Sequence, residues 1–122
     1  MYQEILTFWF EELESKDWFV SSSDIDKQIE TRFLTILEQA AQSELFHWRE
    51  TAQGRLAEII VLDQFSRNVY RNTPKSFAQD ALALALAQEA IRLGVDQELT
   101  DVERSFLSVS YTHLTLPTIN WV

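Results

Sequence analysis

Apolar side chains recur at helical spacing along most of this chain. A first stripe at positions i, i+3, i+4 and i+7 predicts a helix over residues 2–13, and its members are Leu6, Trp9, Phe10 and Leu13. A second stripe, from Ile25 to Ala40, predicts a helix that begins at Ser23, the expected N-cap, and ends within residues 41–43. Residues 14–22 carry Trp18 and Phe19 and are expected to form the intervening loop.

The most apolar stretch, residues 56–62, lies inside a predicted helix over residues 51–70. A helix that is apolar on nearly every side is typically buried on several sides. A β-strand over residues 59–62 is the alternative, but the flanking residues keep a helical period and show no turn signal. Thr73-Pro74 ends this region, because the residue before proline is disfavoured in the α conformation.

Two further helices are predicted in the second half of the chain. One is expected to be capped by Ser76, to run to Leu93 and to stop at Gly94 in the left-handed conformation. Its two apolar faces are typical of a helix packed between neighbours. Thr100 and Glu103 match a capping box that opens a helix over residues 101–107. The pattern therefore predicts an all-α fold of antiparallel helical hairpins.

The composition agrees with this fold and narrows the function. Two Gly and two Pro among 122 residues favour long helices over turn-rich β-structure. The absence of Cys excludes a disulfide framework and a thiol nucleophile, and we expect no metal site and no cofactor. A formal net charge of −9 argues against nucleic-acid binding. Neither a secretory signal nor an apolar run of about 18 residues is present, so we expect a cytoplasmic protein without membrane contact.

A polar cluster follows directly on the most apolar helical segment. Its members are Asp63, Gln64, Arg67, Asn68, Arg71 and Asp80. Asp63, Arg67 and Arg71 are spaced i, i+4 and i+8, so they share one helical face. Asp80 stands one turn into the next predicted helix, where it is expected to reach Arg67 or Arg71 across the hairpin.

Three interpretations of this cluster are open. In the first, Asp63 and Asp80 neutralise both arginines, and the two amide side chains satisfy loop backbone groups. In the second, a basic island binds a small carboxylate or phosphate; its members are Arg55, Arg67, Arg71 and Lys75. The third is hydrolytic catalysis. It lacks a nucleophile–base pair, since His47 is the only histidine outside the last fifteen residues.

The last fifteen residues, SVSYTHLTLPTINWV, contain no charged side chain. The run VSYTHLTLPT is similar to a translated transposon-based sequencing adapter, read GTC TCT TAT ACA CAT CTG ACG CTG CCG ACG. A sample index would then supply residues 119–121, and GTG TAG the final valine and a stop. A C-terminal β-strand is the alternative, and it explains neither match. We therefore expect residues 1–107 to be the N-terminal part of one all-α domain that continues past Leu107 in nature. We expect residues 108–122 to be non-native, and we give Tyr111, His113 and Trp121 no functional weight.

Several motifs resemble the bacterial domain of unknown function 924 family. They are LDQFSRNVYR at 62–71, FAQD at 77–80, ILTFWF at 5–10, the pair Trp18-Phe19, and Trp48 ahead of GRLA at 54–57. Members of that family often have proline where this chain has Ser66. The resemblance implies a tetratricopeptide-like superhelix in proteins longer than this chain, with a His-Ser-Glu motif in later helices. It implies no activity, substrate or cofactor.

Two function classes remain open. The chain is either a helical scaffold that binds a peptide or protein on a concave face, as stacked helical hairpins commonly do, or a domain that binds or transforms a small anionic molecule at the Asp/Arg cluster. Fold analogy favours the scaffold. The sequence predicts no particular oligomeric state.

Overall fold

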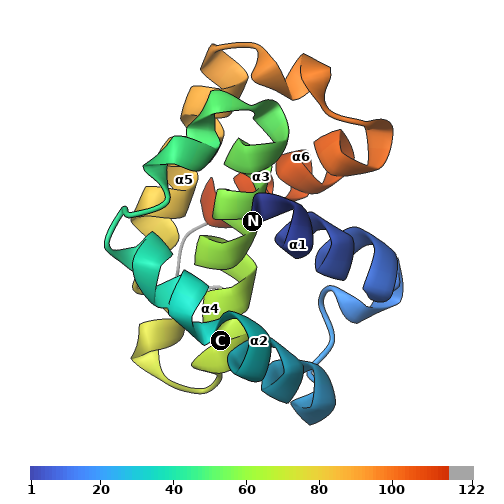
Figure 1. The fold of residues 1–122 in the computed structure, drawn as a ribbon, viewed down its shortest axis with the longest axis vertical. Helices are drawn as coiled ribbons and strands as arrows, with labels where there is room; N and C mark the ends of the chain where they lie inside the picture. The colour runs from blue at the N-terminus through green and yellow to red at the C-terminus, as the bar shows by residue number, and fades with distance from the viewer. Residues whose placement is uncertain (116–122) are drawn as a thin grey trace.

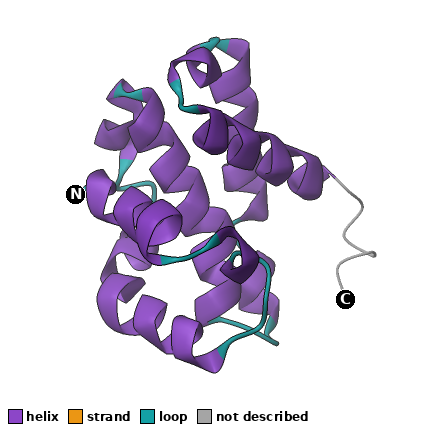
Figure 2. Cartoon of the chain, turned by 90° about the vertical axis from the view of Figure 1, so that its right-hand side faces the viewer, coloured by secondary structure: helices purple, strands orange, loops and turns teal. Residues whose placement is uncertain are grey.

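The computed structural model describes residues 1–115 of the chain. These residues form helices joined by short turns, and no strand occurs among them (Figure 2). The predicted all-α class is confirmed. Residues 59–62 are helical, as the period of their neighbours predicted.

The first two helices follow the predicted stripes, with one shifted cap. α1 (Tyr2–Thr7) continues into a π-helical turn, η1 (Phe8–Glu12), so the helix ends one residue before the predicted residue 13. α2 (Ser23–Ala41) is capped by Ser22 and not by Ser23. Ser22 has extended backbone angles and its Oγ accepts the Ile25 N–H at 3.4 Å, the geometry that a capping residue needs.

One long helical segment runs through the middle of the molecule (Figure 1). It consists of α3 (Ala52–Ile60), the π-helical turn η4 (Val61–Phe65) and α4 (Ser66–Val69). Every residue from 56 to 66 is buried, which explains why most of this stretch is apolar. Gly54 lies near its start, where a Cβ atom would come within 2.0 Å of the Trp48 carbonyl oxygen. The helix therefore approaches the preceding 3-10 turn, η3 (Phe46–Glu50), more closely than any larger residue would allow.

The hairpin after α4 starts its second helix later than predicted. Pro74 opens a 3-10 turn, η5 (Pro74–Phe77), and α5 (Asp80–Arg92) begins only afterwards. Ser76 therefore does not cap α5. Its hydroxyl donates to the Thr73 carbonyl at 2.7 Å and closes the turn that proline initiated. The predicted stop at Gly94 is confirmed, with a φ of 75°.

A short 3-10 turn, η6 (Val95–Glu98), leads to α6 (Asp101–Thr115). The capping box is confirmed, because the Thr100 N–H donates to Glu103 Oε1 and the Glu103 N–H donates to Thr100 Oγ1. α6 continues eight residues past Leu107, so residues 108–115 are helical and not a strand. The non-native origin of residues 108–122 stays a prediction, and Trp121 lies outside the described residues.

The core places α3 in contact with α1 and α5, α2 against η4 and α4, and α6 against α5. The largest buried side chains are aromatic, and they are Trp9, Phe8, Phe33, Phe65 and Phe106. Trp18, in the loop before α2, donates its indole N–H to the Trp9 carbonyl at 2.8 Å. This bond fixes the loop against the core. No described helix combines the length and the apolar character that crossing a bilayer requires.

Candidate functional site

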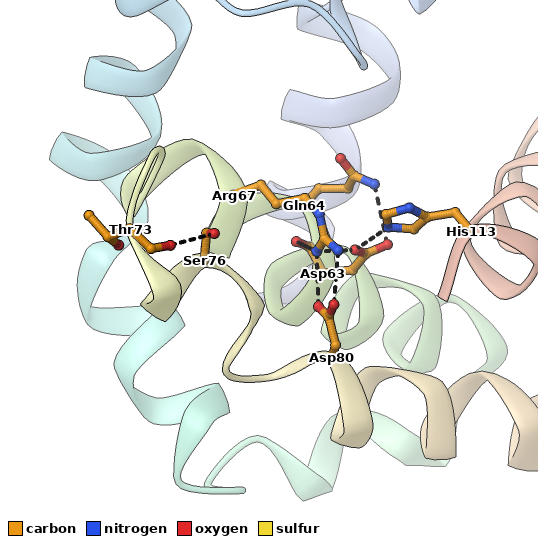
Figure 3. Close-up of polar contacts among 7 residues, drawn as sticks. All are labelled: Asp63, Gln64, Arg67, Thr73, Ser76, Asp80 and His113. Atoms are coloured by element: carbon orange, nitrogen blue, oxygen red, sulfur yellow. Dashed lines mark hydrogen bonds and ion pairs between the residues drawn. The ribbon is translucent and has the colours of Figure 1, made fainter. Parts of the chain in front are cut away.

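An ion-pair network joins the two arms of the α4–α5 hairpin (Figure 3). Arg67 lies between two carboxylates: its Nη1 donates to Asp63 Oδ1 at 2.6 Å and to Asp80 Oδ1 at 3.0 Å. The Arg67 Nη2 donates to Asp80 Oδ2 at 3.0 Å, so that the guanidinium binds both oxygens of Asp80. Nη1 also donates to the Asp63 carbonyl at 2.8 Å. The predicted contact across the hairpin is confirmed for Arg67.

The two carboxylates of this network differ in their surroundings. Asp63 is fully buried in the π-helical turn, whereas the Asp80 side chain keeps 17% of its surface exposed at the start of α5. Burial raises the pKa of Asp80, the hydrogen bond and charge of Arg67 lower it in part, and the negative charge of Asp63 raises it further. Figure 3 shows His113 reaching the network from α6, where its Nε2 lies 2.9 Å from Asp63 Oδ1.

Arg71 does not belong to the Asp63–Arg67–Asp80 network, contrary to the prediction that Asp63 and Asp80 neutralise both arginines. Its Nε and Nη2 donate to the two carboxylate oxygens of Asp26, on α2, at 2.8 and 3.0 Å. Asn68 donates to the same carboxylate at 2.8 Å. Burial raises the pKa of Asp26, but the hydrogen bonds from Arg71 and Asn68 outweigh it, so that the pKa is lowered overall. Arg71 meets Asp26 because α2 packs on α4.

The other cluster residues also find partners that the sequence did not indicate. Gln64 and Asn68 bind carboxylates, not the loop backbone: the Gln64 Nε2 donates to Asp63 Oδ2 at 3.2 Å. The predicted basic island does not gather in one place: Arg67 and Arg71 bind carboxylates, and Lys75 lies over the Tyr70 ring at 4.5 Å.

The remaining chemistry-bearing side chains form no reactive cluster. His47 is exposed, with its ring against those of Phe46 and Trp48. Within residues 1–115, no group of three or more metal-ligating side chains gathers.

A hollow of about 130 Å³ opens between the loop before α2 and the polar face of α4. We call it the aromatic hollow, and its lining residues are Trp18, Phe19, Val20, Gln64, Arg67, Asn68, Arg71 and His113. It brings four of the six predicted site residues together on one wall. Asp63 and Asp80 lie behind that wall, as partners of Arg67.

Sequence reasoning missed two carboxylate partners. Asp26 stands in the first turn of α2, where a negative charge is favourable without any specific partner, so the sequence did not single it out. Glu58 is fully buried and binds Arg49 through two hydrogen bonds of 2.8 Å. A glutamate inside the most apolar helix was the available signal, because charged residues are rarely buried without a partner.

The fold and the site define an all-α protein in which two partly buried arginine–carboxylate networks lie at the C-terminal end of the central helical segment. The chain belongs to a family of bacterial proteins of unknown function (DUF924), whose model matches residues 5–116. It is similar to a solved structure, that of the protein of unknown function ATU0120 from Agrobacterium tumefaciens, with 36% identity and a TM-score of 0.84. The match covers 92% of this chain and 63% of that protein, so the chain spans less than two thirds of that relative's length. No curated protein matches the chain.

Proposed function

We propose that this chain is a helical scaffold that binds a peptide or protein segment. The observation that carries the proposal is that the arginines are already neutralised within the fold. Arg67 is bound by Asp63 and Asp80, and Arg71 by Asp26. Three carboxylates therefore face two guanidinium groups, which leaves no excess positive charge to attract an anionic substrate.

The exposed apolar side chains around these networks support a binding role. Phe19, at the rim of the aromatic hollow, is 62% exposed, and Phe77, on the hairpin bend, is 42% exposed. Large exposed aromatic residues that flank a rigid, hydrogen-bonded framework are typical of surfaces that bind partners. The ion pairs would then hold α2, α4 and α5 in fixed relative positions, so that such a surface is preorganised.

A random-peptide display selection against the immobilised chain tests this proposal. Selected sequences are synthesised and titrated against the soluble chain by isothermal calorimetry. We expect at least one peptide to bind saturably with a Kd below about 100 μM, equivalent to roughly −5.5 kcal/mol. A selection that yields only peptides without saturable binding would contradict a scaffold function.

A small-anion site in the aromatic hollow is the second candidate. It is favoured by one observation: the side chains of Arg67 and Arg71 line the hollow together with two amides. An anion at 100 times its Kd should stabilise the fold by about 2.7 kcal/mol. A thermal-shift series with phosphate, sulfate, acetate and citrate tests this candidate, and it fails if the unfolding temperature responds no more than it does to chloride at equal ionic strength.

A further inference from the structure

The aromatic hollow has one apolar wall and one polar wall. Trp18, Phe19 and Val20 contribute the apolar wall from the loop before α2. The polar wall carries Gln64, Arg67, Asn68 and Arg71, and His113 of α6 also lines the hollow. The hydrogen bond from the Trp18 indole to the Trp9 carbonyl ties the apolar wall to η1.

The polar wall has hydrogen-bonding capacity left after its internal contacts are made. Arg71 uses Nε and Nη2 on Asp26, Asn68 uses Nδ2 on the same carboxylate, and Gln64 uses Nε2 on Asp63. Among residues 1–115, Arg71 Nη1, Asn68 Oδ1 and Gln64 Oε1 have no hydrogen-bond partner. The wall therefore offers two amide oxygens as acceptors, and it offers donors at Arg71 Nη1 and at the second N–H of each amide nitrogen.

This combination matches a peptide group, which has one carbonyl acceptor and one N–H donor. A carboxylate has acceptors only, so it would use the donors of the wall but would leave both amide oxygens without a donor. The charge balance of the two networks also favours an uncharged ligand over an anion. Asp26, Asp63 and Asp80 outnumber Arg67 and Arg71 by one negative charge. A protonated His113 beside Asp63 would bring the balance to zero, not to a positive value.

The size of the hollow limits what enters it. A volume of about 130 Å³ is close to the roughly 150 Å³ of an apolar protein cavity that holds one benzene molecule. One aliphatic side chain or one aromatic ring therefore fits between the walls. The ring faces of Trp18 and Phe19 are suited to an apolar side chain.

We propose that the aromatic hollow binds one apolar residue of a peptide through its uncharged backbone amide. The peptide carbonyl accepts a hydrogen bond from Arg71 Nη1, and the peptide N–H donates to the amide oxygen of Asn68 or Gln64. The apolar side chain packs against Trp18 and Phe19. This inference rests on the scaffold function proposed above and places its binding site. Its proposed contacts use no residue of the segment 108–122, although His113 also lines the hollow.

A pair of small probes of the same shape tests the inference. N-acetyl-leucine N-methylamide is uncharged, whereas N-acetyl-leucinate carries a carboxylate in place of the second amide. Each is titrated into the ¹⁵N-labelled chain, and the indole N–H of Trp18 and the side-chain amide signals of Asn68 and Gln64 are followed by NMR. We expect the uncharged probe to shift these signals and to bind at least about tenfold more tightly, a difference of roughly 1.4 kcal/mol.

Phe19→Ala removes one of the two aromatic rings of the apolar wall and should abolish binding of the uncharged probe. Phe46→Ala is the matched control, because Phe46 is equally exposed at 65% and does not line the hollow. Tighter binding of the carboxylate probe would overturn the inference in favour of the anion site. Absence of any shift up to about 50 mM probe, roughly −1.8 kcal/mol, or binding unaffected by Phe19→Ala, would overturn it as well. A positive peptide-display result alongside either of these last two outcomes would leave the scaffold function standing and move its site elsewhere.

Discussion

Replacing Arg67 with methionine tests whether the Asp63–Arg67–Asp80 network holds the hairpin together. Methionine keeps an unbranched apolar side chain but removes the four hydrogen bonds that the guanidinium group donates to Asp63 and Asp80. Asp63, with no exposed surface, and Asp80, 17% exposed, would then face each other without a cation between them. Leaving a buried charge without its partner costs about 3–5 kcal/mol. Because Asp80 retains some contact with water and Asp63 retains His113, we expect the lower part of that range, about 3–4 kcal/mol.

Urea unfolding followed by far-ultraviolet circular dichroism measures this loss. With an m-value of about 1.5 kcal/mol/M, a loss of 3–4 kcal/mol lowers the midpoint by roughly 2–2.7 M. The matched control is Arg92→Met, which removes an exposed arginine paired with Glu89 on the surface of α5. Exposed pairs contribute little because water and salt screen them, so this variant should unfold close to the wild-type midpoint.

A triple variant separates the loss of the pair from the presence of unpaired charge. Arg67→Met combined with Asp63→Asn and Asp80→Asn leaves no buried charge at the hairpin and should recover most of the lost stability. The reasoning is refuted if Arg67→Met unfolds at the same midpoint as Arg92→Met. It is also refuted if the triple variant is no more stable than the single one, since the cost would then not come from uncompensated carboxylates.

Further variants probe the acid response, a buried hydroxyl and a close backbone contact. The pKa of Asp26 is lowered in the fold, so the ionised carboxylate stabilises the protein at a pH above its ordinary pKa of 3.8. This stabilisation is lost as the pH falls through the pKa of the folded state. The difference in stability between wild type and Asp26→Asn should therefore narrow in acid. The pKa of Asp80 is raised in the fold, so wild type should gain stability relative to Asp80→Asn as the pH falls towards 3.8, measured by urea titration at successive pH values. Ser66→Ala removes a buried hydroxyl that has no partner among residues 1–115. It should raise the free energy of unfolding by up to about 1 kcal/mol, which is read as a higher urea midpoint. Gly54→Ala forces a Cβ atom to within 2.0 Å of a carbonyl oxygen and should cost more than Gly94→Ala, which meets open space and only the left-handed penalty of about 1–2 kcal/mol, as read from thermal unfolding.

Each of these expectations has a clear contrary result. Parallel pH profiles for Asp26→Asn and Asp80→Asn would show that the two carboxylates do not have opposite pKa shifts in the fold. A lower midpoint for Ser66→Ala would mean that its hydroxyl contributes a hydrogen bond. Equal melting temperatures for the two glycine variants would show that the helix backbone at Gly54 moves aside at little cost.

Signals confined to a few neighbouring residues were predicted well. The Thr100–Glu103 capping box and the left-handed Gly94 both depend on groups within one turn, and both are present in the structure. Local signals of this kind also predicted two helix N-caps at the wrong residue. Residues 21–23 are all serine, and only the path of the chain selects Ser22 as the cap of α2. Ser76 had the right type and spacing, but the 3-10 turn that Pro74 opens uses its hydroxyl first.

The chain alone determined that the molecule is helical, that its central helix is buried, and that Asp80 meets Arg67 or Arg71 across the hairpin; the structure selects Arg67. Those outcomes follow from a 3.6-residue period and from a hairpin that joins positions only thirteen residues apart. Tertiary structure decided the partner of Arg71, since Asp26 is 45 residues away and reaches it only because α2 packs on α4. It also built the aromatic hollow, where the loop anchored by Trp18 faces α4. Helical period fixes which face of a helix is apolar, but not which distant segment covers that face, because many apolar stripes are chemically equivalent partners until the whole core is packed.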